Sequence, residues 1–302
     1  MNHNSKLLQK IKENLHGTVL VDEPLAKHTS FKIGGPADFY VIPNDEADLL
    51  TLLDLCRSEG LPRFVIGRGT NLLVSDAGFR GVVIDLSRAC SHFRIENSLV
   101  TVGAGILIED LIICSMASEL SGGEKLSGIP GSVGGAVILN AGAFGSEVKD
   151  ILAAVKLVDA DNKIKNVSRD RIVMSYRQTD IAPDAIVLEA SFNLRPGIRS
   201  EIEKIRKEIL ACRQAKQPLS LPSAGSVFKR PPGDYAGRLI EEAGLKGLRI
   251  GAALVSEKHA NFIVNCGAAS ASDVYRLIIE IQEIIMKRFG ILLEPEVRLL
   301  GF

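Results

Sequence analysis

Apolar residues recur at the spacing of amphipathic helices in five stretches of the chain. The clearest stretch begins at Ser270 and Asp273, which form a capping-box pair, and ends at Gly290. The other predicted helices cover residues 1–17, 45–58, 106–120 and 201–216. In the helix that ends at Gly290, the apolar residues of one face are Val274, Leu277, Ile278, Ile281 and Ile285.

Alternating or short apolar runs, bounded by turn residues, predict strands between these helices. Residues 93–105 alternate on both sides of Asn97-Ser98, which is typical of a β-hairpin. Hairpins mixed with helices indicate an α+β fold and not the regular alternation of a doubly wound sheet. The chain changes character near 197–215, so we place the main boundary there, with a smaller α/β lobe after it. The remaining predicted strands cover residues 37–43, 63–67, 153–160, 163–168, 186–194, 261–265 and 296–302.

The composition argues against several classes of function. The 302 residues contain 36 Lys and Arg and 36 Asp and Glu, so no global basic field recruits nucleic acid or an anionic membrane. No apolar run is long enough to cross a bilayer, and residues 1–17 lack the apolar core of a signal peptide. The five cysteines are scattered, and the histidines show no ligand spacing. We expect a cytoplasmic protein without disulfides, metal, membrane insertion or a nucleic-acid partner.

Two glycine-rich segments predict a cofactor with two phosphates. The first follows a strand but lacks the third glycine and the helix of a Rossmann motif, so its backbone N–H groups would cradle a pyrophosphate. The second opens a predicted helix whose first N–H groups would favour an anion. Either segment alone could be a tight turn. The candidate cofactor-binding residues are Gly67, Arg68, Gly69, Thr70, Asn71 and Leu72 in the first segment, and Gly128, Ile129, Pro130, Gly131, Ser132, Gly134, Gly135, Ala136, Asn140 and Gly142 in the second.

Three polar residues could carry the chemistry. Arg177 stands in SYRQT, Ser226 in PSAGSVFKRP and Glu296 in EPEVR, where alternation puts Glu296 and Arg298 on one strand face and Val297 and Leu299 on the other. An arginine for a carboxylate, a hydroxyl to deliver a proton and a carboxylate to tune both suit reduction of an enol-type acid. Taken singly, they could be a surface ion pair, a turn hydroxyl and a partner of Arg298. Spacing alone does not bring them together, and we interpret His259 as a hydrogen-bonded structural residue.

The motifs, in their order, resemble those of the UDP-N-acetylenolpyruvoylglucosamine reductases, the MurB flavoenzymes of bacterial cell-wall synthesis. The resemblance begins at HTSFKIGGPADFYVIP and continues through IGRGTNLLVSDAGFRGVVI and LSGIPGSVGGAVILNAGAFGSEV. It then covers SYRQTD, CRQAKQPLSLPSAGSVFKRP, SEKHANFIVN and EPEVRLLG, so that nearly the whole chain takes part. Any one motif could occur by chance, but their order and completeness make the resemblance specific.

The resemblance implies a fold and a reaction. Members have an FAD-binding region of the vanillyl-alcohol-oxidase (PCMH) type, built of two subdomains, and a smaller C-terminal α/β substrate-binding domain. Carried over, the subdomains are residues 1–84 and 85–205 and the substrate-binding domain is 206–295, with strand 296–302 returning to the first subdomain. FAD is bound noncovalently, and NADPH reduces it. UDP-N-acetylglucosamine enolpyruvate then receives a hydride at C3 and a proton at C2, giving UDP-N-acetylmuramate. We expect a monomer.

The family's residues carry over by motif. Arg177 would bind the substrate carboxylate and stabilise enolate-like charge, Ser226 would donate the proton to C2, and Glu296 would orient the carboxylate and polarise the intermediate. The residues expected at the substrate phosphates are Lys216 and Arg213. Lys229 and Arg230 suit either stabilisation of the developing alkoxide or phosphate binding.

One departure from the longer branch of the family concerns the substrate lid. That branch carries a loop with a tyrosine that covers the substrate, whereas no tyrosine stands between Tyr176 and Lys216 here. The chain therefore resembles the shorter, type II branch, in which the lid is not identified by sequence.

Two other hypotheses compete with that of a reductase. A flavin-dependent oxidase of a sugar or lactone would share the fold, but such enzymes often attach FAD through His or Cys, and neither glycine segment contains one. A non-catalytic nucleotide-sugar-binding module would not need Arg177, Ser226 and Glu296, and all three are present.

Overall fold

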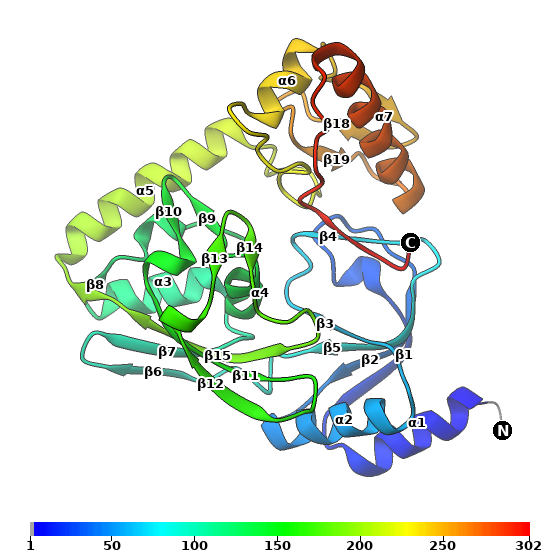
Figure 1. Cartoon of the computed structure of the whole chain (residues 1–302), viewed down its shortest axis with the longest axis vertical. Coiled ribbons are helices and arrows are strands. Elements are labelled where there is room, and N and C mark those ends of the chain that lie inside the picture. The colour runs from blue at the N-terminus through cyan, green and yellow to red at the C-terminus, as the bar shows by residue number, and fades with distance from the viewer. Residues whose placement is uncertain (1–2) are drawn as a thin grey trace. The chain divides into compact units, whose positions relative to one another are not determined.

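The computed structural model describes residues 3–302 of the chain (Figure 1). It consists of two compact units. Unit 1 comprises the residues up to 21, 39–67 and 81–212, and unit 2 comprises 22–38, 68–80 and 213–302. The helix α5 (Arg199–Lys216) therefore belongs in part to each unit. The division by role into residues 1–84, 85–205 and 206–295 stays a prediction, because packing alone defines these units.

The first sheet, which lies mainly in unit 1, has four strands. Their order is β1 (Thr18–Pro24), β2 (Pro36–Ile42), β5 (Phe79–Asp85) and β3 (Arg63–Ile66). The helices α1 (His3–Asn14) and α2 (Glu46–Ser58) share a hydrophobic cluster with β2. The side chain of Asp45 caps α2 by accepting a hydrogen bond from the N–H of Asp48 at 2.8 Å. The helix predicted over residues 45–58 is confirmed, and its apolar face is buried at Leu49, Leu52, Leu53 and Cys56.

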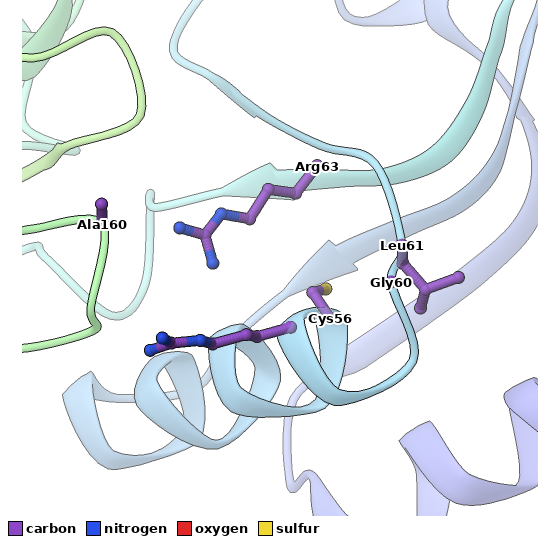
Figure 2. A pocket seen from close by; sticks show the side chains of 6 residues that line it. Cys56, Gly60, Leu61, Arg63 and Ala160 are labelled. Carbon is purple, nitrogen blue, oxygen red and sulfur yellow. The ribbon is translucent and has the colours of Figure 1, made fainter.

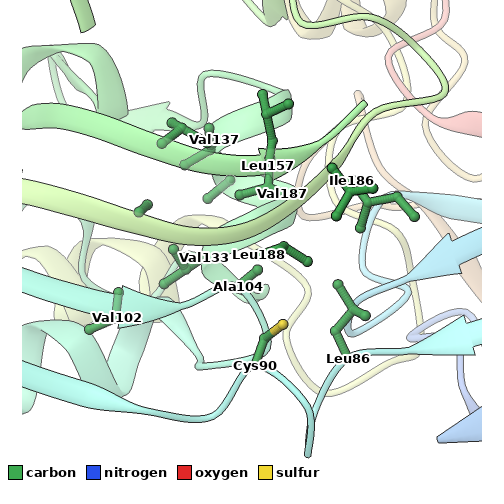
Figure 3. Close-up of a cluster of buried hydrophobic side chains, with 14 of the residues drawn as sticks. Leu86, Cys90, Val102, Ala104, Val133, Val137, Leu157, Ile186, Val187 and Leu188 are labelled. Carbon is green, nitrogen blue, oxygen red and sulfur yellow. The ribbon is translucent and has the colours of Figure 1, made fainter. Parts of the chain in front are cut away.

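The second sheet of unit 1 has five antiparallel strands. Their order is β12 (Ile164–Ser168), β11 (Leu152–Val158), β15 (Ile186–Asn193), β7 (Leu99–Gly103) and β6 (Phe93–Glu96). The predicted hairpin is confirmed, because Glu96 pairs with Leu99 and Asn97 takes the positive φ of 56° that such a turn needs. Helices α3 (Ile108–Ala117) and α4 (Val133–Ile138) complete the core. Figure 3 shows Val133 and Val137 of α4 among the side chains of the sheet, including Val102, Leu157 and Leu188.

Short paired segments and single helical turns connect these elements. Three pairs of two-residue strands belong to unit 1: β8 (Leu120–Ser121) with β16 (Arg195–Pro196), β9 (Gly142–Ala143) with β10 (Ser146–Glu147), and β13 (Met174–Ser175) with β14 (Gln178–Thr179). The 3-10 turns are η1 (Leu25–Lys27), η2 (Glu124–Leu126), η3 (Val148–Asp150) and η4 (Arg169–Arg171).

Unit 2 has its own core beneath the helix α7 (Ala271–Phe289). The capping box of Ser270 and Asp273 forms as predicted, and Gly290 ends the helix with a left-handed φ of 70°. The predicted apolar face is buried. The core also contains α6 (Ala236–Glu242) and the sheet β17 (Arg249–Ile250), β18 (Ala253–Val255) and β19 (Ile263–Asn265).

The last strand of the chain is shorter than predicted. β20 (Arg298–Leu300) pairs in parallel with β4 (Leu72–Val74) in unit 2. The expected alternation is wrong at this point: Val297 and Leu300 are buried, whereas Leu299 is 40% exposed. The backbone of Glu296 and Val297 bonds to Val227 and not to β4, so the segment changes partner before the strand begins.

No helix among residues 3–302 combines the length and the apolar character needed to span a membrane.

Asp76 caps the amino end of α7, although it lies almost two hundred residues earlier in the chain. Its carboxylate accepts hydrogen bonds from the N–H of Ala271 at 2.8 Å and of Ser272 at 3.0 Å. Partial burial raises the pKa of Asp76, but these hydrogen bonds outweigh it and leave the pKa below the ordinary 3.8. A group with a lowered pKa stabilises the fold at pH values above its unfolded pKa, and this contribution is lost as the pH falls through the folded pKa.

We predict that Asp76→Asn lowers the free energy of unfolding by about 1 kcal/mol at pH 7, because two orphan N–H groups lose a charged acceptor. The difference from wild type should shrink as the pH falls below 3.8. Urea unfolding across this pH range measures it. Asp161→Asn is the control, because Asp161 pairs with Arg57 in an exposed ion pair and should change stability by less than about 0.5 kcal/mol. A difference that is constant with pH would contradict the account.

Candidate functional site

The first residue of the first glycine segment lies against the second glycine segment inside unit 1. A Cβ on Gly67, the first residue of the first segment, would lie 2.3 Å from Oγ of Ser132 in the second. Ser132 is buried and caps α4, where its Oγ accepts the N–H of Gly135 at 3.4 Å. Glycine is therefore required at Gly67 by this close approach, and not by a positive φ.

The expectation that the first N–H groups of α4 are available to an anion is wrong. The N–H of Val133 donates to the carbonyl of Ile106 at 2.8 Å, and that of Gly134 to the carbonyl of Ala104 at 2.9 Å. The cause is an antiparallel bridge between Leu107 and Ser132, which lays the helix start against the preceding loop. Within the described chain, the N–H groups of Gly131 and Ser132, directly before the helix, form no hydrogen bond.

The rest of the first glycine segment, 68–72, belongs to unit 2. Gly69 has a φ of 58°, and a Cβ there would lie 2.2 Å from the carbonyl oxygen of His28. Its carbonyl accepts the N–H of Ser30 at 3.1 Å, while the N–H groups of Arg68 and Gly69 form no hydrogen bond within residues 3–302. This turn therefore presents two neighbouring backbone donors.

Ser226 and Glu296 lie on neighbouring extended segments of unit 2. The N–H of Glu296 donates at 2.7 Å to the carbonyl of Val227, the residue that follows Ser226. Asn71, at the end of the first glycine segment, donates through Nδ2 to the carbonyl of Glu296 at 3.0 Å. The structure therefore brings three sequence-predicted residues together. Ser226 is half-buried, and its hydroxyl forms no hydrogen bond within the described chain.

Asn261 fixes the strand that carries Ser226. Its side chain accepts the N–H of Phe228 at 3.0 Å and donates to the carbonyl of Phe228 at 2.8 Å, and its own carbonyl accepts the N–H of Val227 at 2.8 Å. Sequence reasoning did not identify this residue, because its partner lies 33 positions away. The only signal was a polar residue opening the predicted strand 261–265.

His259 is held within the same unit as a structural residue. Burial lowers the pKa of its imidazole. Its Nδ1 accepts the N–H of Asn261 at 3.2 Å, and its ring lies 4.8 Å from the ring of Phe262. The neutral ring therefore carries its proton on Nε2.

Arg177 belongs to unit 1, on the two-residue turn between β13 and β14. Its φ is 58°, and its Nη2 donates to the carbonyl of Gly142 at 3.0 Å. Its guanidinium carbon also lies 5.1 Å from the ring centroid of Tyr176. Asn140 contacts the same turn, because its Nδ2 donates to the carbonyl of Ser175 at 2.9 Å. Arg177 thus lies beside the end of the second glycine segment.

The four predicted substrate-binding cations all belong to unit 2. Arg213 is buried near the end of α5, whereas Lys216 is exposed and forms no ion pair among the described residues. Lys229 forms an ion pair with Glu294. Arg230 lies with its guanidinium carbon 4.4 Å from the ring centroid of Tyr235.

The predicted residues thus divide between the units. Unit 1 holds Gly67, the second glycine segment and Arg177, and unit 2 holds 68–72, Ser226 and Glu296 with the four cations. The roles assigned to these residues stay predictions.

A separate hollow in unit 1 contains none of the predicted residues. It has a volume of about 220 Å³. Figure 2 shows Cys56 and Arg63 at this hollow. Arg57 bonds to Asp161 at 3.2 Å and Arg63 to Asn162 at 3.3 Å, so both guanidiniums have partners. Burial raises the pKa of Cys56 to about 11, which keeps the thiol protonated. The lining residues are Cys56, Arg57, Gly60, Leu61, Arg63 and Ala160.

Comparison with known families matches both parts of the chain. Residues 37–168 match the model of an FAD binding domain. Residues 217–300 match the model of the C-terminal domain of UDP-N-acetylenolpyruvoylglucosamine reductase. The fold is accordingly an FAD-binding α+β region with a smaller C-terminal domain.

Curated relatives and a solved structure match almost the whole chain. The UDP-N-acetylenolpyruvoylglucosamine reductase of Agathobacter rectalis is 46% identical and that of Caldanaerobacter subterraneus subsp. tengcongensis is also 46% identical, with 94% and 98% of both chains covered, respectively. The crystal structure of the reductase from Thermus caldophilus superposes with a TM-score of 0.81 at 34% identity, covering 95% of this chain and 100% of that one. The chain therefore belongs to the MurB family of UDP-N-acetylenolpyruvoylglucosamine reductases.

Proposed function

We propose that this protein reduces UDP-N-acetylglucosamine enolpyruvate to UDP-N-acetylmuramate in peptidoglycan precursor synthesis, using FAD and NADPH. The observation that carries the proposal is the half-buried Ser226 hydroxyl, without a hydrogen bond in the described chain, on a segment bonded to Glu296. In a chain of this family, that arrangement supports proton delivery to a substrate carbon. We also propose that the protein works in the cytoplasm as a monomer.

The residues of the glycine segments fit FAD. Gly67 and Gly69 leave no room for a Cβ, and the N–H groups of Arg68, Gly69, Gly131 and Ser132 form no hydrogen bond within residues 3–302. Each of these two pairs of neighbouring backbone donors, one pair in each unit, suits a phosphate group. Neither segment contains the His or Cys of a covalent linkage, which supports noncovalent binding. FAD held by these segments would supply hydride transfer between NADPH and C3 of the enolpyruvyl ether.

Arg177 would bind the carboxylate of the enolpyruvyl group. A guanidinium can donate two parallel hydrogen bonds to a carboxylate, which fixes the plane of the group. As the C2–C3 double bond is lost, negative charge spreads from C2 into that carboxylate. A guanidinium already oriented by the carbonyl of Gly142 stabilises this charge without reorganisation.

Ser226 would donate its proton to C2. A serine hydroxyl is a weak acid, but the carbanion-like C2 is a strong base, so a well-placed hydroxyl is sufficient. The new C3–H and C2–H bonds replace the π bond between these carbons, and the serine regains a proton from solvent. Glu296, held by Val227 and Asn71 through its backbone, would orient the carboxylate.

Two cations of unit 2, Lys216 and Arg213, would bind the diphosphate of the substrate. Lys216 is exposed and forms no ion pair among the described residues, which supports a role as a phosphate contact, and Arg213 lies one helical turn before it. Lys229 already neutralises Glu294, so we assign it to holding the segment 294–296 beside Ser226.

The direct test is the mass of the product. Purified protein incubated with NADPH and UDP-N-acetylglucosamine enolpyruvate should give a nucleotide sugar that is heavier by two hydrogens, with one NADPH consumed per product. Consumption of oxygen with a sugar or lactone, and no change in the enolpyruvate, would instead indicate an oxidase. Binding of the enolpyruvate without turnover would indicate a binding module.

We predict that Ser226→Ala slows product formation roughly 10²- to 10⁴-fold, because the proton donor is lost. Reduction of the flavin by NADPH should stay within about twofold of wild type, since that step needs no proton from Ser226. Stopped-flow absorbance of the two half-reactions separates these effects. Ser220→Ala, an exposed serine of the same region, is the control. Equal loss in both half-reactions would argue against a proton donor.

We predict that Gly67→Ala weakens flavin binding about tenfold or more, because its Cβ would displace Ser132 Oγ and disturb the turn. Flavin fluorescence during reconstitution of the deflavinated protein measures the affinity. Gly237→Ala is the control, because a Cβ in this helical position has only ordinary contacts, the nearest at 3.5 Å. Unchanged affinity in Gly67→Ala would remove the first segment from the cofactor site.

A further inference from the structure

Asn140 is a buried residue whose side chain is fully engaged inside unit 1. Its exposed fraction is 0%, and its φ is 41°, a conformation that asparagine tolerates better than most residues. Nδ2 donates to Oε2 of Glu147 at 2.9 Å and to the carbonyl of Ser175 at 2.9 Å. Oδ1 accepts the N–H of Lys149 at 3.0 Å. Both amide protons and the amide oxygen are thus used within the protein.

The bond to Ser175 connects Asn140 to Arg177. Ser175 is the last residue of β13, two positions before Arg177 on the hairpin turn. Two neighbours of Asn140 also contact the hairpin. The carbonyl of Gly142 accepts from Nη2 of Arg177 at 3.0 Å, and the carbonyl of Ile138 accepts from Oγ1 of Thr179 at 3.1 Å. Residues 138–142 therefore set the position of both the hairpin backbone and the guanidinium.

The paired part of the hairpin is short, and bonds between Val173 and Asp180 and the packing of Met174 on the core of unit 1 also hold it. β13 and β14 contain two residues each, and Arg177 itself takes a positive φ of 58°, which is uncommon for arginine. A two-stranded ribbon of this length is not stable by itself. The bond from the buried amide of Asn140 to the carbonyl of Ser175 is therefore a direct restraint on the strand that leads into Arg177.

We propose that Asn140 is a positioning residue for Arg177, and not a direct ligand of the cofactor as its motif suggested. This inference rests on the proposed function for the role of Arg177. An asparagine is needed because the site requires two donors and one acceptor at a positive φ. An aspartate would keep the acceptor but lose both donors, and it would place a second carboxylate 2.9 Å from that of Glu147.

The test compares Asn140→Asp and Asn140→Gly with wild type and with Asn265→Asp. Glycine accepts the positive φ, so it serves if the aspartate variant does not fold. Asn265 is the matched control: it is also buried and forms three side-chain bonds, to Phe31, Gly267 and Ala269, but it contacts no predicted site residue. Hydrogen exchange of residues 173–180, flavin affinity and the two half-reactions are measured for each protein.

We expect the Asn140 variants to exchange the hairpin amides at least about tenfold faster than wild type, while Asn265→Asp does not. Flavin affinity and reduction by NADPH should stay within about twofold. Reoxidation by the enolpyruvate should slow roughly 10- to 100-fold, because a misplacement of about 1 Å can cost that much. In an Arg177→Ala background the Asn140 substitution should add less than about twofold, since its effect passes through Arg177.

Three results would overturn the proposal. Weakened flavin binding with unchanged hairpin exchange would make Asn140 a cofactor ligand. If the Asn140 substitution slowed reoxidation by the enolpyruvate as much in the Arg177→Ala background as in wild type, Asn140 would have a generally structural role. Unchanged hairpin exchange would by itself end the positioning account. If wild type does not react with the enolpyruvate, the proposed function fails separately, and hairpin exchange still decides whether Asn140 holds Arg177.

Discussion

Three hydrogen bonds around residues 296–298 set the arrangement of the predicted catalytic residues of unit 2. The N–H of Glu296 bonds to Val227 at 2.7 Å, Nδ2 of Asn71 to the carbonyl of Glu296 at 3.0 Å, and the N–H of Arg298 to the carbonyl of Asn71 at 3.1 Å. They join the first glycine segment, the segment that carries Ser226 and Val227, and the carboxyl end of the chain. Because every partner is a backbone group or the half-buried amide of Asn71, the arrangement does not depend on which side chain Glu296 itself contacts. The pairing of β20 with β4 continues it.

Local chemistry made much of the fold predictable from the sequence. The capping box at Ser270, the left-handed end at Gly290 and the buried face of α7 follow from residues that act within one or two helical turns. The hairpin around Asn97 follows in the same way, from a turn residue and alternation. The site residues were predicted from motifs of the family and not from spacing, because Ser226 and Glu296 become neighbours only through bonds formed across the fold.

Contacts between distant segments account for what the sequence did not predict. The N–H groups at the start of α4 bond to Ile106 and Ala104, so a pattern that suggested an anion site describes a helix docked on a loop. Asn261 bonds to Phe228 and Asn140 to Ser175, and neither partner is visible from the local sequence. The alternation expected at Leu299 fails because the chain changes its hydrogen-bonding partner between Val297 and Arg298. In each case, a hydrogen bond to a backbone group of a distant segment determines what the residue does in the fold.

In the proposed reaction, one flavin passes electrons from NADPH to an enolpyruvyl nucleotide sugar. The most direct measurement is an anaerobic visible spectrum of the purified protein with FAD, recorded after NADPH and again after UDP-N-acetylglucosamine enolpyruvate. We expect NADPH to bleach the flavin absorbance and only the enolpyruvate to restore it. Flavin that bleaches but does not recover with the enolpyruvate would contradict the claim. So would a protein that binds no flavin after reconstitution.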